Sequence, residues 1–342
     1  MGYTMKDVAE RAGVSLATVS HVLNKTRYTT PETESRVLEA VRELNYHTNT
    51  HARRLAMKQS DLFGLIISEI SNPFFPEIVN GFQMAAWKEG FDTLLCNTEH
   101  DQMRSDNAIR NMLQSNVRGV AVMSSALTHK SVEHLKASEI GVVFYNLGRA
   151  EKLVSNIQIN YQTGISRSID HLMELGHRRI AVISGPQTNR TAITLQKAIV
   201  EELESRRLQP SPILESNFKV DGGASAVQII LGQSSIPTAI FCSNDLIAMG
   251  AMSALEEAGV KVPEDVSIVG FDDIFFARLS RPPLTTVRIP REQLGELAFK
   301  ALHKMSLSKR HSGIEYQIET ELVIRKSTAP ANLKLTRTLV SL

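Results

Sequence analysis

Apolar residues in the first 47 positions recur at helical spacing in three short stretches. The first stretch begins after Thr4, a residue type that caps helices, and ends at Gly13, which favours a helix stop. The second stretch covers residues 16–23 and follows another capping residue, Ser15. Two short helices around a glycine-containing turn predict a helix-turn-helix. A third helix is predicted from Pro31, because proline is well tolerated at the first position of a helix.

From residue 61 onward the pattern changes to short apolar runs that alternate with amphipathic stretches. The apolar runs predict buried strands at residues 62–67, 92–96, 119–123, 142–145, 179–183, 238–242 and 266–271. The amphipathic stretches predict helices that include residues 76–89, 102–115, 164–175, 245–258 and 291–304. This alternation is typical of doubly wound parallel sheets, and the seven strands suit two lobes better than one sheet. Ligands of such sheets bind at the carboxyl ends of the strands.

The composition is that of an ordinary globular protein, with 42% hydrophobic and 22% charged residues among 342. The net charge is only +2, but residues 1–60 contain nine Lys and Arg against six Asp and Glu. The N-terminal module is therefore the basic part of the chain. A basic module at one end fits contact with nucleic acid.

The two cysteines, Cys96 and Cys242, stand in apolar surroundings, which predicts buried thiols in a reducing compartment rather than a disulfide or a metal site. The first thirty residues contain no signal-peptide pattern, and no run approaches the ~18 apolar residues of a membrane-spanning helix. We therefore expect a cytoplasmic protein with no membrane contact. We expect no cofactor and no bound metal, because the sequence has no phosphate-binding glycine loop and no metal-spaced His/Cys cluster.

The outer side of the second predicted helix can face a DNA major groove. Residues 4–24 closely resemble the headpiece of the lactose-repressor family of bacterial transcription regulators, its purine-repressor branch above all. In that family the segment matching 48–56 is a hinge helix that meets its copy over the operator and drives a leucine into the minor groove, and Leu55 stands at that position here. The residues that the resemblance and the helix faces predict to contact DNA are Thr4, Ser15, Leu16, Ala17, Thr18, Ser20, His21, Asn24, Lys25, Arg53 and Leu55.

The body carries the second part of the resemblance in residues 70–75, 175–180, 242–250 and 266–273. The family's body is similar to periplasmic sugar-binding proteins, with the effector in a cleft between two lobes and three chain crossings between them. The resemblance thus implies an α/β fold, in which an all-α helix-turn-helix headpiece precedes a two-lobed, doubly wound, periplasmic-binding-protein-like body. The expected boundaries are headpiece 1–47, hinge and linker 48–60, N-lobe 61–161 and 292–323, C-lobe 162–291 and 324–335, and tail 336–342.

The effector site implied by this resemblance combines aromatic faces, on which a ring can stack, with polar side chains that provide selectivity. Its expected residues are Phe74, Phe75, Asn146, Asn160, Arg190, Thr194, Phe218, Asn244 and Asp272. The sequence departs from the family at two of them, because Thr194 replaces a common arginine and Asn160 replaces a common aspartate. Arg190, which we expect in the neighbouring loop, can substitute in part. These departures favour a small, partly apolar or aromatic, weakly charged effector, such as a sugar, a nucleobase or an aromatic metabolite.

These observations predict a repressor that binds a pseudo-palindromic operator of about 14 to 18 base pairs as a homodimer, because a two-fold dimer reads mirrored half-sites. An enzyme is disfavoured, since the sequence contains no catalytic motif. A periplasmic binding protein is disfavoured by the headpiece and by the missing signal sequence. One alternative stays open: the cleft is vestigial, and a protein partner or the protein's own concentration controls DNA binding.

Overall fold

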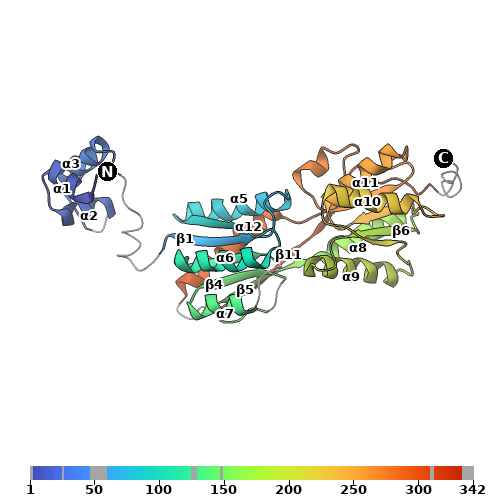
Figure 1. Ribbon diagram of the computed structural model, residues 1–342, viewed down its shortest axis with the longest axis horizontal. Coiled ribbons are helices and arrows are strands. Elements are labelled where there is room, and N and C mark those ends of the chain that lie inside the picture. Colours follow the sequence, from blue (N-terminus) through green and yellow to red (C-terminus); the bar gives the residue numbers. More distant parts are fainter. Residues whose placement is uncertain are drawn as a thin grey trace. The chain divides into compact units, whose positions relative to one another are not determined.

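The computed structural model of the protein describes residues 3–24, 27–46, 60–124, 129–146, 149–308 and 312–332 (Figure 1). The chain divides into two compact units, Met1–Ser60 and Asp61–Leu342, which we call the headpiece and the body and describe separately. The predicted hinge helix, residues 48–56, lies outside the described residues, and of the predicted linker after it only Ser60 is described. The predicted tail lies outside the described residues as well.

The described part of the headpiece forms the three predicted helices, α1 (Met5–Ala12), α2 (Leu16–Asn24) and α3 (Pro31–Glu43). Thr4 caps α1 and Thr30 caps α3, each by accepting a hydrogen bond from a backbone N–H of the first turn. Gly13 ends α1 with a φ of 63°, a left-handed conformation that glycine adopts readily. The buried core consists mostly of small side chains, namely Val8, Ala9, Ala12, Val19, Val22, Val37, Ala40 and Tyr46.

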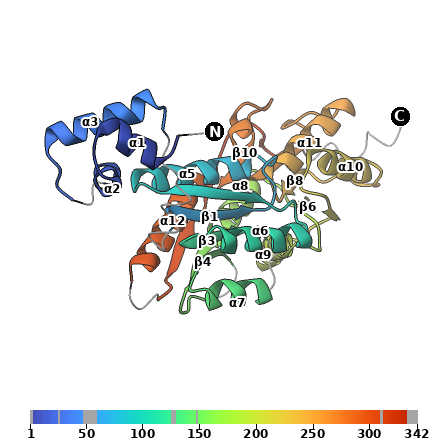
Figure 2. The ribbon, with the colours of Figure 1, turned by 60° about the vertical axis from the view of Figure 1, so that its left-hand side comes forward.

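The first sheet of the body has the strand order β11-β5-β4-β3-β1-β2, and its strands pair in parallel. These strands are β1 (Leu62–Ile67), β2 (Asp92–Asn97), β3 (Gly119–Met123), β4 (Gly141–Tyr145), β5 (Val154–Asn160) and β11 (Glu315–Glu319). Its helices are α5 (Phe74–Lys88), α6 (Gln102–Gln114), α7 (His129–Ala137) and α12 (Arg291–Leu307). Alternate residues of β1 point to opposite faces: Phe63 and Leu65 join the core under α5 and α12, whereas Ile66 joins the core under α6 and α7. Figure 2 shows α5 on one side of β1 and α6 and α7 on the other.

The second sheet has the order β12-β10-β9-β8-β6-β7, in which only β12 runs antiparallel to its neighbour. Its strands are β6 (Ile180–Ser184), β7 (Ile213–Glu215), β8 (Ala239–Cys242), β9 (Ser267–Asp272), β10 (Thr285–Arg288) and β12 (Glu321–Val323). The elements around it are α8 (Tyr161–Glu174), α9 (Arg190–Ser205), α10 (Val220–Leu231), α11 (Asp245–Glu257) and the 3-10 helix η1 (Phe275–Arg278). Residues of α8 and α9 bury one face of the sheet, and those of α10 and α11 bury the other. We call the first sheet with its helices the N-lobe and the second the C-lobe.

The chain crosses between the lobes three times, after β5, between β10 and α12, and at Thr320 between β11 and β12. The expectation that residues up to 323 belong to the N-lobe was wrong, because residues 321–323 form β12, which pairs with β10 of the C-lobe. The first and third crossings are joined, since the Thr320 hydroxyl donates to the Asn160 carbonyl at 2.7 Å. The Thr320 oxygen also accepts from the Gly164 backbone N–H at 3.0 Å.

Helices α5 and α12 of the N-lobe approach each other closely. A side chain at Gly81 would overlap the Glu292 carbonyl group, and one at Gly295 would overlap the Ile78 carbonyl oxygen. The two glycines therefore let the helix backbones touch, which fixes the start of α12 against the start of α5. Within the described ranges, no helix is long and apolar enough to cross a membrane.

Candidate functional site

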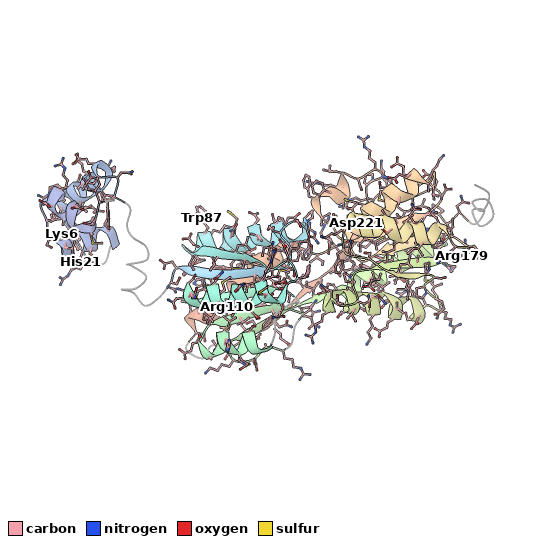
Figure 3. The ribbon with its side chains drawn as sticks, in the orientation of Figure 1. Lys6, His21, Trp87, Arg110, Arg179 and Asp221 are labelled. Carbon is pink, nitrogen blue, oxygen red and sulfur yellow. The ribbon has the colours of Figure 1, made fainter. Side chains whose placement is uncertain are left out.

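The first candidate site is the outer face of α2. Val19 and Val22 point into the headpiece core, whereas Ser15, Leu16 and Ala17 are exposed. The Leu16 side chain is 52% exposed and therefore stays accessible on the outer face of this helix. Figure 3 shows His21 on this helix. The remaining predicted contacts on α2, Thr18, Ser20 and His21, are half-buried.

Two of the residues predicted to contact DNA, Thr4 and Ser15, form hydrogen bonds that cap helices of the headpiece. The Ser15 oxygen accepts a hydrogen bond from the Thr18 backbone N–H at 3.1 Å and so caps α2. Thr4 and Asp7 form a capping box, in which the Thr4 backbone N–H donates to the Asp7 carboxylate at 2.6 Å. These bonds lower the pKa of Asp7, because they stabilise its charged form. Lys25, Arg53 and Leu55 lie outside the described residues, and Asn24 is the last residue of α2.

The second candidate site is a cavity of about 590 Å³ between the N-lobe and the C-lobe, a volume suited to a small molecule. Eight of the nine predicted effector residues line it: Phe74, Phe75, Asn146, Arg190, Thr194, Phe218, Asn244 and Asp272. The prediction for Asn160 was wrong, because its side chain donates to Glu319 at 2.8 Å and to Thr163 at 3.0 Å and does not line the cavity. Asn160 instead stabilises the first chain crossing.

Aromatic rings come to the cavity from both lobes. Phe74 and Phe75 begin α5 and lie edge to face, with ring centroids 5.3 Å apart. Phe218 comes from the C-lobe, where its φ is 63° and its ring lies against Gly185, which has no side chain to displace it. Asn244 holds this turn by donating to the Phe218 carbonyl at 3.0 Å, while its oxygen caps α11. Asn244 therefore positions Phe218 as well as lining the cavity.

The polar groups that line the cavity differ in whether they already form hydrogen bonds within the protein. Thr194 donates to the Arg190 carbonyl at 2.9 Å, and Arg190 is the first residue of α9 rather than part of a loop as we had expected. The Asn146 oxygen accepts from the Ile159 backbone N–H at 2.7 Å. By contrast, the buried Ser243 hydroxyl has no hydrogen-bond partner among the described residues. A buried hydroxyl without a partner is a place where a ligand atom can bind.

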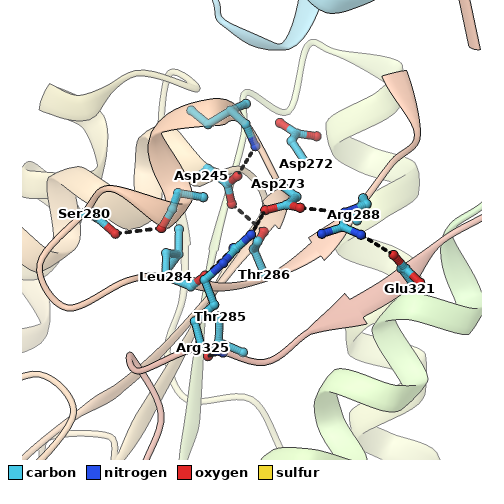
Figure 4. A network of polar contacts seen from close by, with 12 residues as sticks. Asp245, Asp272, Asp273, Ser280, Leu284, Thr285, Thr286, Arg288, Glu321 and Arg325 are labelled. Carbon is cyan, nitrogen blue, oxygen red and sulfur yellow. Dashed lines mark hydrogen bonds and ion pairs between the residues drawn. The ribbon is translucent and has the colours of Figure 1, made fainter. Parts of the chain in front are cut away.

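Asp272 stands at the end of β9 with a φ of 110°, and its carboxylate accepts no hydrogen bond from the described residues (Figure 4). Burial, with the nearby Asp245 carboxylate, raises its pKa, and Arg291 opposes that rise. Asp245 is buried behind it, where it accepts from Thr286 at 2.5 Å and from the Ile274 backbone N–H at 2.8 Å. Burial raises the pKa of Asp245 to about 7. The Asp272 carboxyl group is thus available to a ligand.

The sequence analysis missed several polar lining residues, namely Ser68, Glu69, Asn72, His100, Ser124 and Tyr145. Most of them follow the carboxyl ends of β1, β2 and β3, so the rule on strand ends would have found them. Glu69 of the N-lobe lies 3.7 Å from the Lys219 ammonium of the C-lobe and 3.9 Å from the His100 ring nitrogen. Glu69 and His100 thus add polar groups to the cavity beside its aromatic walls.

Two family models match the chain: bacterial regulatory proteins of the lacI family over residues 4–49, and the periplasmic binding protein-like domain over residues 169–328. The HTH-type transcriptional repressor PurR of Pasteurella multocida (strain Pm70) is 35% identical over 327 residues, which are 95% of this chain and 98% of that protein.

Solved structures agree with these sequence matches. The lac repressor dimer bound to operator and the anti-inducer ONPF is similar with a TM-score of 0.86 and 29% identity, over 96% of this chain and 100% of that one. The complex of the transcriptional regulator CelR with cellobiose has a TM-score of 0.69 and 28% identity, over 95% of this chain and 99% of that one. The chain belongs to the lacI family of bacterial regulatory proteins, as a transcriptional repressor with a helix-turn-helix headpiece and a periplasmic-binding-protein-like body.

Proposed function

We propose that the protein binds a pseudo-palindromic operator as a homodimer, and that its DNA affinity changes when a small, weakly charged ring compound binds between the two lobes. The observation that carries the effector proposal is the cavity itself, which joins aromatic faces from both lobes to the carboxyl group of Asp272. A ligand that touches both lobes can favour one arrangement of them over another. We also propose that the protein acts in the cytoplasm and catalyses no reaction.

The DNA arm of the proposal rests on α2. Its exposed end, from Ser15 to Ala17, can enter a major groove, where the first residues of a recognition helix contact base edges. We assign base contacts to this end and to His21, and phosphate contact to Lys25. Selection from random DNA should enrich mirrored half-sites over about 14 to 18 base pairs. Enrichment of sites without such symmetry would contradict the dimeric reading.

Exposed apolar side chains of the body support the homodimer. Met84 and Trp87 project from α5, and Trp87 is 71% exposed (Figure 3). In the C-lobe, Phe275, Phe276 and Leu279 are each about half exposed or more. Large apolar groups gathered on a surface indicate a contact with another protein. A second copy is the occupant we propose, since the lac repressor structure of the same fold is a dimer.

The chemistry of the cavity limits the effector class. A ring compound would stack on Phe74 or Phe218, and a donor group on it would bind Asp272. Thr194 stands where an arginine would bind a phosphate or carboxylate in two places, so a sugar phosphate would leave polar groups unpaired at a cost of about 1 to 3 kcal/mol each. The cellobiose found in the CelR complex is a neutral ring compound of the kind we propose.

The proposed effector class is tested by calorimetric titration of the full chain with hypoxanthine, cellobiose, phenylalanine and ribose 5-phosphate. We expect a neutral ring compound to bind and Phe74→Ala to weaken it, while Phe91→Ala, which removes a half-buried ring outside the cavity, leaves it unchanged. Micromolar binding of ribose 5-phosphate, unaffected by Phe74→Ala, would contradict this class. Absence of binding by any compound would favour the open alternative of a vestigial cleft.

A further inference from the structure

Arg291 is a buried arginine at the second crossing between the lobes. It is the first residue of α12, directly after the chain has left β10, and its side chain is only 6% exposed. Its guanidinium donates in two directions. On the N-lobe side, Nε and Nη2 donate to the Glu77 carboxylate of α5 at 3.1 and 2.8 Å. On the C-lobe side, Nη2 donates to the Asp273 carbonyl at 2.6 Å, and Nη1 donates to the Asp272 carbonyl.

The C-lobe group that Arg291 binds is the turn that aims Asp272 into the cavity. Asp272 and Asp273 have φ values of 110° and 55°, conformations that residues with side chains rarely adopt. Such a turn persists only where its surroundings hold it. The Asp273 carboxylate is held by Arg288 at 2.7 Å and by Arg325 at 2.5 Å (Figure 4), and Arg291 holds the two carbonyl groups.

The N-lobe group that Arg291 binds belongs to α5, the helix whose first residues form the other wall of the cavity. Glu77 lies in the first turn of α5, which begins with Phe74 and Phe75. The close packing of α5 on α12 fixes Glu77 opposite Arg291. One planar guanidinium therefore contacts both the support of Asp272 and the support of the stacking rings, and a lysine could not make these bonds at once.

We propose that Arg291 is a positioning residue of the cavity, which couples the orientation of Asp272 in the C-lobe to the position of the Phe74 helix in the N-lobe. The proposal rests on the proposed effector site and deepens it, because ligand contact with either wall is then transmitted to the other through one side chain. The titratable groups around the guanidinium are the carboxyl groups of Glu77, Asp272, Asp273 and Asp245. An arginine is the residue that can satisfy this acidic surrounding from the hinge.

The chain offers a matched control in Arg206, which is 19% exposed and pairs with Asp170 at 2.7 Å and with Glu202. Both partners belong to the C-lobe, so Arg206→Gln removes comparable ion pairs within one lobe. Arg291→Gln removes contacts in both lobes. Glu77→Gln weakens only the N-lobe contact and leaves the two carbonyl bonds of Arg291 in place.

Amide hydrogen exchange of the ligand-free full chain tests the coupling directly. We expect Arg291→Gln to speed exchange about tenfold both at residues 272–275 and in the first turn of α5, since each charged hydrogen bond lost eases local opening. Glu77→Gln should affect only α5, and Arg206→Gln only α8 and α9. Faster exchange at only one of the two segments in Arg291→Gln, or no change at either, would overturn the proposal.

Titration with hypoxanthine and cellobiose supplies a readout that a merely structural role would not change. We expect Arg291→Gln to raise the dissociation constant of whichever probe binds by about tenfold, whereas Arg206→Gln, at a similar loss of thermal stability, leaves it within about twofold. Equal effects of the two variants would overturn the positioning role. If neither probe binds the unaltered protein, the proposed effector class fails, and the exchange experiment still decides whether Arg291 couples the lobes.

Discussion

The headpiece carries its candidate DNA contacts on one short helix, whereas the body assembles its cavity from residues that follow the strands of two sheets. In the headpiece, burial of Val19 and Val22 leaves neighbouring positions of α2 outside. In the body, Phe74 and Phe218 line the same cavity only because the two lobes face each other. The comparison shows that a surface on one helix follows from local spacing, while a cavity depends on the whole topology.

The two units also differ in what stabilises them. The headpiece buries small side chains and relies on capped helices, as at Thr4 and Thr30. The body buries large aromatic rings. The ring centroid of Phe299 lies 5.1 Å from that of Phe63 and 5.8 Å from that of Phe82. Loss of one interaction should therefore lower the free energy of unfolding more in the body than in the headpiece.

Removal of residues 1–60 should have the largest effect. We expect specific operator binding to fall by about 10³-fold or more, because the remaining chain lacks α2. The thermal unfolding of residues 61–342 should stay unchanged, since the two units are compact separately. Fluorescence anisotropy and calorimetry measure the two quantities. A clear drop in the body's melting temperature would show that the units are not independent.

Phe299→Ala should destabilise the body by about 3 to 5 kcal/mol, because it leaves a cavity among packed aromatic rings. Met103→Ala is the matched control, since Met103 is 69% exposed and its loss should change the free energy of unfolding by less than about 0.5 kcal/mol. Chemical denaturation reports both values. The headpiece, followed by its own amide exchange, should be unaffected by either substitution.

The two units should respond to pH in opposite directions. The pKa of Asp245 is raised from 3.8 to about 7, so the native body keeps a proton that the unfolded chain releases, and stability falls as pH rises from about 4 to 7. Asp245→Asn should remove this loss, which amounts to about 1.4 kcal/mol per pH unit for one proton. In the headpiece the pKa of Asp7 is lowered. The stability that its ionised carboxylate contributes is therefore present above the pKa that Asp7 has in the unfolded chain, and it is lost as pH falls. Parallel stability curves for wild type and Asp245→Asn would contradict the first expectation.

Thr4→Ala should have the smallest effect, about 1 kcal/mol of headpiece stability, because the capping box of α1 is lost. Thr30→Ala removes the cap of α3 and should cost a similar amount. Anisotropy titrations with operator DNA then separate two roles of Thr4. If Thr4→Ala weakens DNA binding far more than Thr30→Ala at equal stability, Thr4 contacts DNA as the sequence predicts. If they weaken it equally, Thr4 is a cap alone.

Most of the strands that the sequence predicted are buried on both faces, such as β1 and β3, whose residues are almost all apolar. The strands it missed carry polar residues. Strand β5 buries Ser155 and Asn156, and the Ser155 oxygen accepts from the Ile314 N–H at 3.1 Å. Its partner is distant in the sequence, so the pattern of β5 alone cannot reveal that these polar groups are satisfied.

The cavity was predictable in its aromatic residues but less so in its polar ones. Phe74 begins the helix that follows β1, which marks it as a lining residue. Asn160 is the last residue of β5, yet it donates to Glu319, a neighbour that only the topology supplies. Glu69 and His100 come shortly after β1 and β2, so the rule on strand ends marks their positions, but neither residue belongs to a motif that indicates binding. The role of Arg291 could not be predicted from the sequence, because its hydrogen-bond partners lie in both lobes.

The three crossings determine the order in which the protein can be completed on the ribosome. Strand β11 is the neighbour of β5, and β12 is the neighbour of β10, yet both strands emerge after α12. Neither lobe can therefore add its last strand to its sheet until nearly the whole chain has been made, although the headpiece helices emerge first. A nascent chain would hold a finished DNA-reading unit attached to two unfinished sheets with open edges, a state in which unpaired strands invite aggregation.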